Sequence, residues 1–282
     1  MKIKYYIPTR DRYDKQKTLF CLPKNILKDT YIVCEENQIK KYISSCVPTI
    51  NKKNILAFPY NYGKNIIKKY GCFSDKKQFI LENTNADYIY FLDDDLEFLS
   101  RDKQYKLHKA DKQEVKIIFE ILNNWLNKGI NHIGLSARMG NNRETKSFVE
   151  NTRSTNAVGF NVKIIKENKI KLNRLLLMSD FDTTLSLLEL GFKNRVLFDF
   201  AYSPSASNSV GGCSLYRTPE TMKSSAELLH SLHPKFVKVK KKTTKKPWSG
   251  FKTKTRYDVI ISWKKAFAFG LNKKKKPVNI YF

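Results

Sequence analysis

Short apolar runs alternate with helical patterns along the first half of the sequence, and this alternation limits the folds that the chain can adopt. Four of the runs are compact and bounded by turn residues, at 31–34, 55–58, 88–92 and 132–135. Such runs are typical of strands buried in a parallel sheet. Apolar residues at helical spacing lie between them, at 74–81 and 113–128. The pattern predicts an α/β fold with a mixed, mostly parallel central sheet that helices cover on both faces.

The second half of the chain is less regular but continues the same pattern. The expected elements are two strands (155–162 and 195–201), two helices (179–190 and 218–230) and two long polar loops (138–153 and 203–216). Ser179 is a suitable N-cap for the first of these helices, and Gly191 is a suitable stop. We therefore assign residues 1–234 to one α/β domain and residues 235–282 to a basic extension that packs on it.

The chain is strongly basic, and its charge is uneven. It has 53 Lys and Arg against 26 Asp and Glu, a formal net charge of +27. Residues 235–282 contain 16 of these cations and a single acid, Asp258. Such a charge predicts attraction to a polyanion, and nucleic acid is the commonest one. Lysine enrichment in an A/T-rich genome accounts for part of the excess, but not for the shortage of acids in one segment.

Several protein classes are disfavoured by what the sequence lacks. No apolar run approaches the ~20 residues of a membrane-spanning helix, and charged residues interrupt the N-terminus before a secretory signal forms. There is no Walker-type loop, GxGxxG motif or GxSxG elbow, which argues against a P-loop NTPase and a Rossmann dehydrogenase. The five cysteines lack CxxC pairing, so we expect reduced thiols and a cytoplasmic protein.

The strongest chemical signal is the run Asp93-Asp94-Asp95, which directly follows the apolar strand at 88–92. Ligands of open α/β sheets bind at the carboxyl ends of strands. Three adjacent carboxylates repel one another unless a cation neutralises them, and their hard oxygens suit Mg²⁺ or Mn²⁺. Asp93 and Asp95 lie on one side of an extended chain. An acidic turn explains a single Asp better than a run of three, so we favour a divalent metal site.

Acidic residues also begin the helix expected at 179–190, in the order Ser179-Asp180-Phe181-Asp182. A serine cap and first-turn acids stabilise a helix through its dipole, so a structural role explains them equally well. The functional interpretation is a carboxylate at the helix start that takes a proton from an attacking hydroxyl. The residues alone do not separate the two interpretations.

Two further groups are candidates for the same site. The turn after the first strand contains Pro8, Thr9, Arg10 and Arg12, whose hydroxyl and guanidinium groups suit a nucleotide base and a diphosphate. His233 follows the helix expected to end near residue 230, and it is a candidate additional metal ligand. A lone histidine is more often a surface or core residue, and that alternative stays open.

Taken in order, these motifs resemble nucleotide-sugar glycosyltransferases of the GT-A fold. The resemblance lies in the first turn IPTRDR, the DxD-type strand end FLDDD and the acidic helix SDFDTTLSLLELGFKN. Four more segments, GLSARMGNNR, NSVGGCSLYRT, SAELLHSLHP and RYDVIISWKKAF, make the set similar to the TET-associated glycosyltransferases. These are phage-type enzymes linked to sugars on hydroxymethylated pyrimidines in DNA. The resemblance spans roughly residues 3–268.

The resemblance implies a Rossmann-like GT-A catalytic domain over residues 1–234 and a DNA-facing role for residues 235–282. It implies a nucleotide-sugar donor, expected to be a UDP-sugar, with Mn²⁺ or Mg²⁺ as the cofactor. The metal would be held by Asp93, Asp95 and His233. The donor would be bound by Pro8, Thr9, Arg10, Arg12, Asp93, Asp94, Trp263 and Lys264.

On the acceptor side, the resemblance implies a carboxylate base in the acidic helix. This chain has Ser179-Asp180 where many members of the wider class have Glu-Asp, so Asp180 and Asp182 both remain candidates. The acceptor or DNA would be bound by Arg138, Asn141, Asn142, Arg143, Lys245, Lys246 and Trp248.

The expected reaction is the transfer of a sugar to a hydroxymethylated pyrimidine, such as 5-hydroxymethylcytosine, in double-stranded DNA. Alternative acceptors are a sugar already attached to DNA and a cell-surface polymer or protein. A nucleic-acid-binding protein without enzymatic activity, in which the aspartates are structural, is a third alternative. The expected location is the cytoplasm, that of the host for a phage-encoded chain. The sugar, the stereochemical outcome and the oligomeric state stay open.

Overall fold

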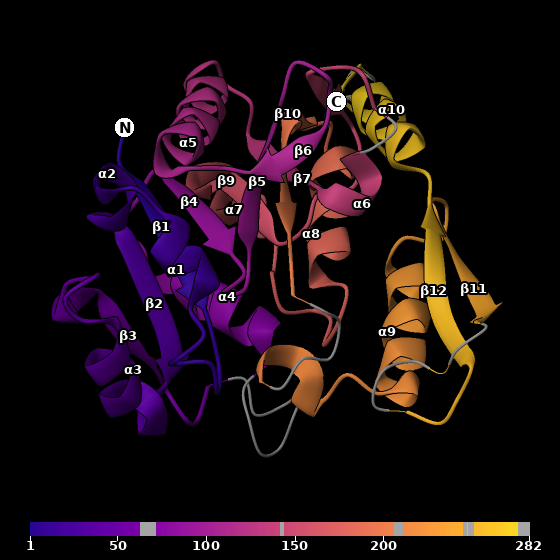
Figure 1. Ribbon diagram of the computed structural model, residues 1–282. Helices are drawn as coiled ribbons and strands as arrows, with labels where there is room; N and C mark the ends of the chain where they lie inside the picture. Colours follow the sequence, from indigo (N-terminus) through magenta and orange to yellow (C-terminus); the bar gives the residue numbers. More distant parts are fainter. Residues whose placement is uncertain (63–71, 142–143, 206–210, 245–246, 248–250, 276–282) are drawn as a thin grey trace, which may run out of the picture.

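A central sheet with helices packed against it forms most of the molecule in the computed structural model (Figure 1). The model describes residues 1–62, 72–141, 144–205, 211–244, 247 and 251–275. The strands of the sheet are β1 (Ile3–Pro8), β2 (Thr30–Glu35), β3 (Ile55–Phe58), β4 (Tyr88–Leu92), β5 (Glu97–Arg101), β6 (Leu107–Lys109), β7 (His132–Ala137), β8 (Phe148–Glu150), β9 (Ala157–Asn161) and β10 (Asn194–Ser203).

Helices occupy most of the connections between these strands. The α-helices are α1 (Lys17–Cys21), α2 (Lys24–Leu27), α3 (Ile39–Cys46), α4 (Phe73–Asn83), α5 (Lys112–Asn127), α6 (Arg138–Asn141), α7 (Val162–Glu167), α8 (Ser179–Glu189), α9 (Pro219–Leu232) and α10 (Trp263–Lys275). Short 3₁₀ turns are η1 (Glu36–Gln38), η2 (Lys52–Asn54) and η3 (Gly212–Leu215).

The sheet is mixed, which confirms the predicted α/β class. Its order is β3-β2-β1-β4-β9-β7-β10-β5-β6, and β8 also pairs with β10. The strands β3, β2, β1 and β4 are parallel, as are β7 and β10. In contrast, β9 is antiparallel to both β4 and β7, and β5, β6 and β8 join as antiparallel strands. Parallel pairing is therefore less extensive than expected, because the predicted strand at 155–162 runs antiparallel as β9 and short antiparallel strands form outside the predicted ones, among them β8 in the expected loop 138–153.

Alternation along β4 explains why its whole sequence is apolar or aromatic. Tyr90 and Leu92 belong to a core cluster on one side of the sheet, which includes side chains of α3 and α5. Ile89 and Phe91 belong to a second cluster on the other side, with side chains of α4 and α7. Successive side chains of a strand point to opposite faces, so a strand covered on both sides needs apolar residues throughout.

The longest predicted helix forms for the expected reasons. At its start, the Asp111 carboxylate accepts hydrogen bonds from the backbone N–H groups of Gln113 and Glu114. The Glu114 carboxylate in turn accepts a hydrogen bond from the Asp111 N–H. This reciprocal capping box satisfies N–H groups that have no partner inside the helix. The apolar stripe of α5 is buried in the core, and Gly129 follows with a φ of 81°, a value that glycine adopts readily.

The residues after η3 form a smaller unit beside the sheet. Strands β11 (Val237–Thr243) and β12 (Thr255–Ile261) form an antiparallel hairpin that packs on α9, and α10 packs on α8. Leu188, Leu229, Val237 and Ala266 are buried in the shared core. Figure 1 shows α9 between the hairpin and the central sheet. The sequence of residues 257–267 has a strand-like pattern throughout, but β12 ends at Ile261 because the helix α10 begins at Trp263.

Helices α8 and α10 approach so closely that the contact requires glycine. A Cβ placed on Gly270 would clash with the backbone of Leu188 and Gly191. Gly191 has a φ of 72° and ends α8, which makes room for α10. Within the described residues, no helix is both long and apolar enough to span a membrane.

Candidate active site

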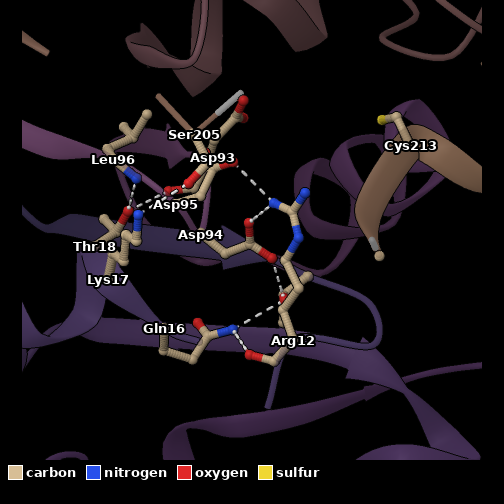
Figure 2. Close-up of polar contacts among 12 residues, drawn as sticks. Arg12, Gln16, Lys17, Thr18, Asp93, Asp94, Asp95, Leu96, Ser205 and Cys213 are labelled. Atoms are coloured by element: carbon tan, nitrogen blue, oxygen red, sulfur yellow. Dashed lines mark hydrogen bonds and ion pairs between the residues drawn. The ribbon is translucent and has the colours of Figure 1, made fainter. Parts of the chain in front are cut away.

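The three aspartates lie at the carboxyl end of β4, next to the turn that follows β1. These two strands are parallel neighbours, so their carboxyl ends meet at one edge of the sheet. Asp94 is buried and accepts hydrogen bonds from the Thr9 hydroxyl and from Nη1 of Arg12, at 2.7 Å for Arg12. The same nitrogen lies 3.0 Å from Oδ2 of Asp95. Figure 2 shows how this arginine connects the first turn to the acidic run.

Asp93 has a different environment from the other two aspartates. Its backbone N–H donates to the Asn156 carbonyl over 2.8 Å, and the Asn156 side-chain amide donates to its carboxylate. Burial raises the pKa of Asp93 to about 7; the Lys77 ammonium acts against this shift, and the Asp180 carboxylate adds to it. A cation bound near Asp93 would therefore strongly favour its ionised form.

The acids at the start of α8 are separated by the geometry of the helix. Two residues apart on a helix, side chains point to nearly opposite sides. Asp180 accepts a hydrogen bond from the buried ammonium of Lys77, which belongs to α4. Burial disfavours the charged form of Lys77, but the charges of Asp180 and Asp93 outweigh burial and raise its pKa. Asp180, Lys77 and Asp93 therefore form one electrostatic group.

Asp182 faces the packing between α8 and α9 instead. Its carboxylate is fully buried, and it accepts hydrogen bonds from Nε and Nη2 of Arg174 at 3.0 and 2.5 Å. Nε2 of His233 lies 2.9 Å from the same carboxylate. The other ring nitrogen of His233 lies 2.5 Å from the Glu189 carboxylate. Asp182 is thus part of a buried ion network that fixes the position of α8.

His233 is not placed as the predicted metal ligand, because both of its ring nitrogens contact carboxylates of α8. Burial disfavours its protonation, but the hydrogen bonds to Asp182 and Glu189 outweigh burial and raise the pKa of His233. An imidazolium that donates from both nitrogens has no lone pair for a metal. Within the described residues, no three His, Cys, Asp or Glu side chains are grouped to hold a metal ion.

The remaining acidic pair still fits a divalent cation by its chemistry. Asp93 and Asp95 supply hard oxygen atoms at the strand end, and burial, followed by the neighbouring carboxylates, raises the pKa of Asp93 against the effect of Lys77, so a bound cation would stabilise its ionised form. We therefore treat these two carboxylates as the part of a metal site that the chain supplies. Arg12 contacts Asp94 and Asp95, and it adds a cation to the same edge of the sheet.

The turn after β1 is held by residues that the sequence analysis did not identify. Pro8 and Arg10 are buried, and Nε of Arg10 donates to Oε1 of Glu35 over 2.5 Å. Nζ of Lys76 lies 2.9 Å from the same Glu35 oxygen and 2.5 Å from the Thr9 carbonyl. This buried cluster fixes the backbone of the turn. Glu35 ends β2, the other parallel neighbour of β1. Its position at the carboxyl end of an expected strand is the one feature of the sequence that could have identified it as a site residue.

The predicted acceptor loop is only partly described. Arg138 is exposed at the start of α6. Asn141 is buried and structural, because its side-chain amide donates to the Ser136 hydroxyl and the Phe198 carbonyl, at 2.5 and 2.8 Å. It is therefore not available to an acceptor. The other five residues predicted to bind the acceptor or DNA lie outside the described residues: Asn142, Arg143, Lys245, Lys246 and Trp248.

The predicted donor-side pair at the start of α10 lies next to α8. The ring of Trp263 packs edge-on against Phe181, with centroids 5.7 Å apart. Lys264 is exposed. Trp263 thus contacts the residue between Asp180 and Asp182, which gives it a packing role at the start of α8.

A half-open pocket of about 400 Å³ lies between α1 and the end of β10. Its lining includes Lys17, Phe20 and Ser205, and Nζ of Lys17 donates to the Ser205 hydroxyl over 3.1 Å. Lys17 precedes Thr18, whose hydroxyl donates to the backbone carbonyl of Asp93, so the pocket wall is connected to the start of the acidic run. The volume falls in the range of about 300–1,000 Å³ that small-molecule sites occupy.

Comparison with solved structures found distant similarities. The 1–349 portion of TarS from S. aureus shares 14% identity, over 82% of this chain and 66% of that chain, with a TM-score of 0.46. Glucosyl-3-phosphoglycerate synthase from Mycobacterium tuberculosis, in complex with Mg²⁺ and uridine diphosphate, shares 9% identity. That match covers 93% of this chain and 87% of the other, with a TM-score of 0.47. The chain thus spans slightly less than two thirds of the TarS structure.

Comparison with curated proteins found no match. A family model gave a specific result, because the model described as TET-Associated Glycosyltransferase matches residues 3–212. This range includes β1 to β10, the three aspartates and the start of α8, so it contains the whole group of site residues that the structure brings together. The chain belongs to the TET-associated glycosyltransferase family.

Proposed function

We propose that the protein transfers a sugar from a nucleotide-sugar donor to a hydroxymethylated pyrimidine in double-stranded DNA. The observation that carries this proposal is the grouping of Asp93 and Asp180 around the Lys77 ammonium at the carboxyl end of β4, with Asp95 close enough to act on Asp93. Family membership supports the sugar-transfer chemistry, and the association with TET systems supports a hydroxymethyl group as the acceptor.

On the donor side, we assign the turn after β1 and the acidic run to binding of a UDP-sugar. Asp93 and Asp95 would hold Mg²⁺ or Mn²⁺, which acts as a Lewis acid toward the departing diphosphate. Arg12, beside Asp94 and Asp95, supplies positive charge to the same leaving group. The buried pair of Arg10 and Glu35 keeps the turn rigid, so Thr9 and Arg12 are positioned before the donor binds.

On the acceptor side, we assign the base to Asp180. As the acceptor oxygen attacks the anomeric carbon, the bond from that carbon to the diphosphate breaks and the hydroxyl proton passes to the Asp180 carboxylate. Lys77 orients this carboxylate by donating to it. Asp182 cannot take this role, because Arg174 and His233 already occupy its oxygens in the core.

The pocket beside the aspartates is suited to the acceptor base. A base in a duplex must leave the stack to reach a reacting group, at a cost of about a few kcal/mol. The aromatic ring of Phe20 is half-exposed in the pocket wall and can stack on a pyrimidine. The pocket wall at Lys17 is joined to the acidic run through Thr18, whose hydroxyl donates to the Asp93 carbonyl, so we assign a pyrimidine in this pocket to the acceptor side of the same site.

The decisive experiment is mass spectrometry of nucleosides from duplex DNA treated with the protein, Mn²⁺ and a panel of nucleotide sugars. Duplexes with cytosine, 5-hydroxymethylcytosine and 5-hydroxymethyluracil are compared. We expect a sugar mass on a hydroxymethylated base and none on cytosine. Donor hydrolysis without incorporation into any DNA would overturn the DNA acceptor and favour a surface polymer or protein. Absence of both hydrolysis and transfer would overturn the enzymatic proposal.

A further inference from the structure

The hairpin β11–β12 has two faces of opposite character. Val237 and Val239 of β11 face α9, together with their β12 partners Val259 and Ile261. The residues between them point the other way, because side chains alternate along a strand. Val237 is fully buried, whereas Lys238, next to it, is exposed. One face therefore belongs to the core, and the other faces away from the molecule.

The outward face is strongly cationic. It carries Lys238, Lys240 and Lys242 on β11, opposite Ile260, Asp258 and Arg256 on β12. Asp258, the only acid of the hairpin, is already paired, because its carboxylate lies 2.5 Å from Nζ of Lys242. Among the described residues, no carboxylate lies within ion-pair distance of Lys238 or Lys240. These two lysines thus offer uncompensated positive charge on an open strand surface.

The spacing of this face matches a polyanion with regular charges. Alternate residues on a strand stand about 7 Å apart, so the three lysines form a row about 14 Å long. Duplex DNA carries about one negative charge per 1.7 Å of its axis, so such a row can meet several phosphates. A two-stranded ribbon also fits the major groove, which is about 12 Å wide. The half-exposed Ile260 adds an apolar contact between the cations.

We propose that the outward face of β11–β12 docks double-stranded DNA through its phosphate backbone. The inference rests on the proposed function, because it identifies where the acceptor duplex is held while one base reaches the aspartates. Figure 1 shows the hairpin at the edge of the molecule, with its outer side uncovered by any described element. The hairpin packs on α9, and His233 at the end of α9 contacts Asp182 of α8, so the cationic face belongs to the same packed unit as the helix that carries Asp180.

The test compares two triple variants by their binding to a hydroxymethylated duplex at several salt concentrations. The hairpin variant carries Lys238→Gln, Lys240→Gln and Arg256→Gln. The matched control carries Lys163→Gln, Lys166→Gln and Lys171→Gln, three exposed lysines near α7. We expect the hairpin variant to lose at least about tenfold in affinity, and its plot of log affinity against log salt to flatten by about 3 in slope. The control should change neither.

Measurements of donor hydrolysis, melting temperature and binding to other polyanions keep this inference separate from the proposed function. Hydrolysis of the donor without DNA, and the melting temperature, should be the same in the hairpin variant and the wild type. If the hairpin variant binds the duplex with the same salt dependence as the wild type, the outward face of β11–β12 is not the docking surface, even where sugar transfer is observed. An equal loss on RNA or anionic vesicles, with none on duplex DNA, would also overturn this inference. Failure of the wild type to transfer any sugar would instead contradict the proposed function alone.

Discussion

Two carboxylates of similar appearance in the sequence, Asp180 and Asp182, have opposite environments in the structure. Asp180 contacts a lysine that also acts on Asp93, whereas Asp182 is enclosed by Arg174 and His233. The periodicity of α8 makes this separation inevitable, but the sequence does not show which side faces the site. That depends on Lys77, which is 103 positions away from Asp180 and reaches it only in the fold.

Substitution of these two acids should separate chemistry from stability. Asp180→Asn should lower the transfer rate by about 10²–10⁴, the usual effect of losing a general base, and should lower stability less than Asp182→Asn does, because Asp93 still compensates the Lys77 ammonium. Asp182→Asn should destabilise the protein by about 1–3 kcal/mol, because it weakens the hydrogen bonds that this buried carboxylate accepts from Arg174 and His233. Initial rates and thermal denaturation of both variants test this. Full activity in Asp180→Asn would contradict the assignment of the base.

A buried histidine makes stability depend on pH. His132 is fully buried, and its Nε2 lies 3.0 Å from the Thr184 hydroxyl; burial lowers the pKa of His132 to about 4. The unfolded chain, with a pKa near 6.5, therefore binds this proton more tightly than the folded chain. Stability is fully present above pH 6.5 and should fall by about 3 kcal/mol as pH drops towards 4.

Urea denaturation between pH 7 and 4.5 measures this contribution. His132→Gln should flatten the curve of unfolding free energy against pH over that range, even where it lowers stability at neutral pH. Parallel curves for His132→Gln and the wild type would mean that a group other than His132 causes the loss of stability at low pH.

At the level of elements, the sequence predicts the strands and helices that have their own hydrophobic periodicity. It misses the elements and clusters that depend on contacts between distant parts of the chain. The apolar strand 88–92 and the helix 113–128 appear as expected, because each has its own pattern and capping residues. The strand β11 was not predicted, since VKVKKKT has a charged majority and becomes a strand by pairing with β12 and by burying Val237 in the core with Leu229 of α9. The cluster of Glu35 and Lys76 was also missed, because it joins β2 to α4.

The contact between α8 and α10 should be sensitive to a single methyl group. Gly270→Ala is expected to destabilise the protein by about 1–3 kcal/mol, because its Cβ meets backbone that cannot rotate away. Gly140→Ala is the matched control, since nothing lies within 4 Å of a Cβ at that position. Chemical denaturation of both variants decides the point, and equal stabilities would contradict the close helix contact.

At the scale of the whole molecule, the family match and the fold divide the chain at nearly the same place. Residues 3–212 match the family model, and the elements after η3 form the unit of α9, β11, β12 and α10. That unit is joined to the site by α8, which contacts α10 and, through His233, the end of α9. Events at the aspartates should therefore affect the stability of both parts together.

Ligand binding should accordingly stabilise the entire chain as one unit. UDP with Mn²⁺, each at about 100 times its dissociation constant, should add about 3 kcal/mol and raise the melting temperature by several degrees. Asp95→Asn should lose most of this shift while keeping the melting temperature of the ligand-free wild type within about 2 °C. Differential scanning fluorimetry measures both. A full shift in Asp95→Asn would remove this residue from the metal site.

The ion network around Asp182 also sets an order of events during synthesis. The first 200 residues can assemble the sheet while the chain is still on the ribosome, since domains fold from the N-terminus as they emerge. The helix α8, however, gains His233 and the glycine contact at Gly270 only when nearly the whole chain has been translated. The packing around α8, the helix that carries Asp180, is therefore completed last, and a chain interrupted before α9 would contain the aspartates without that packing.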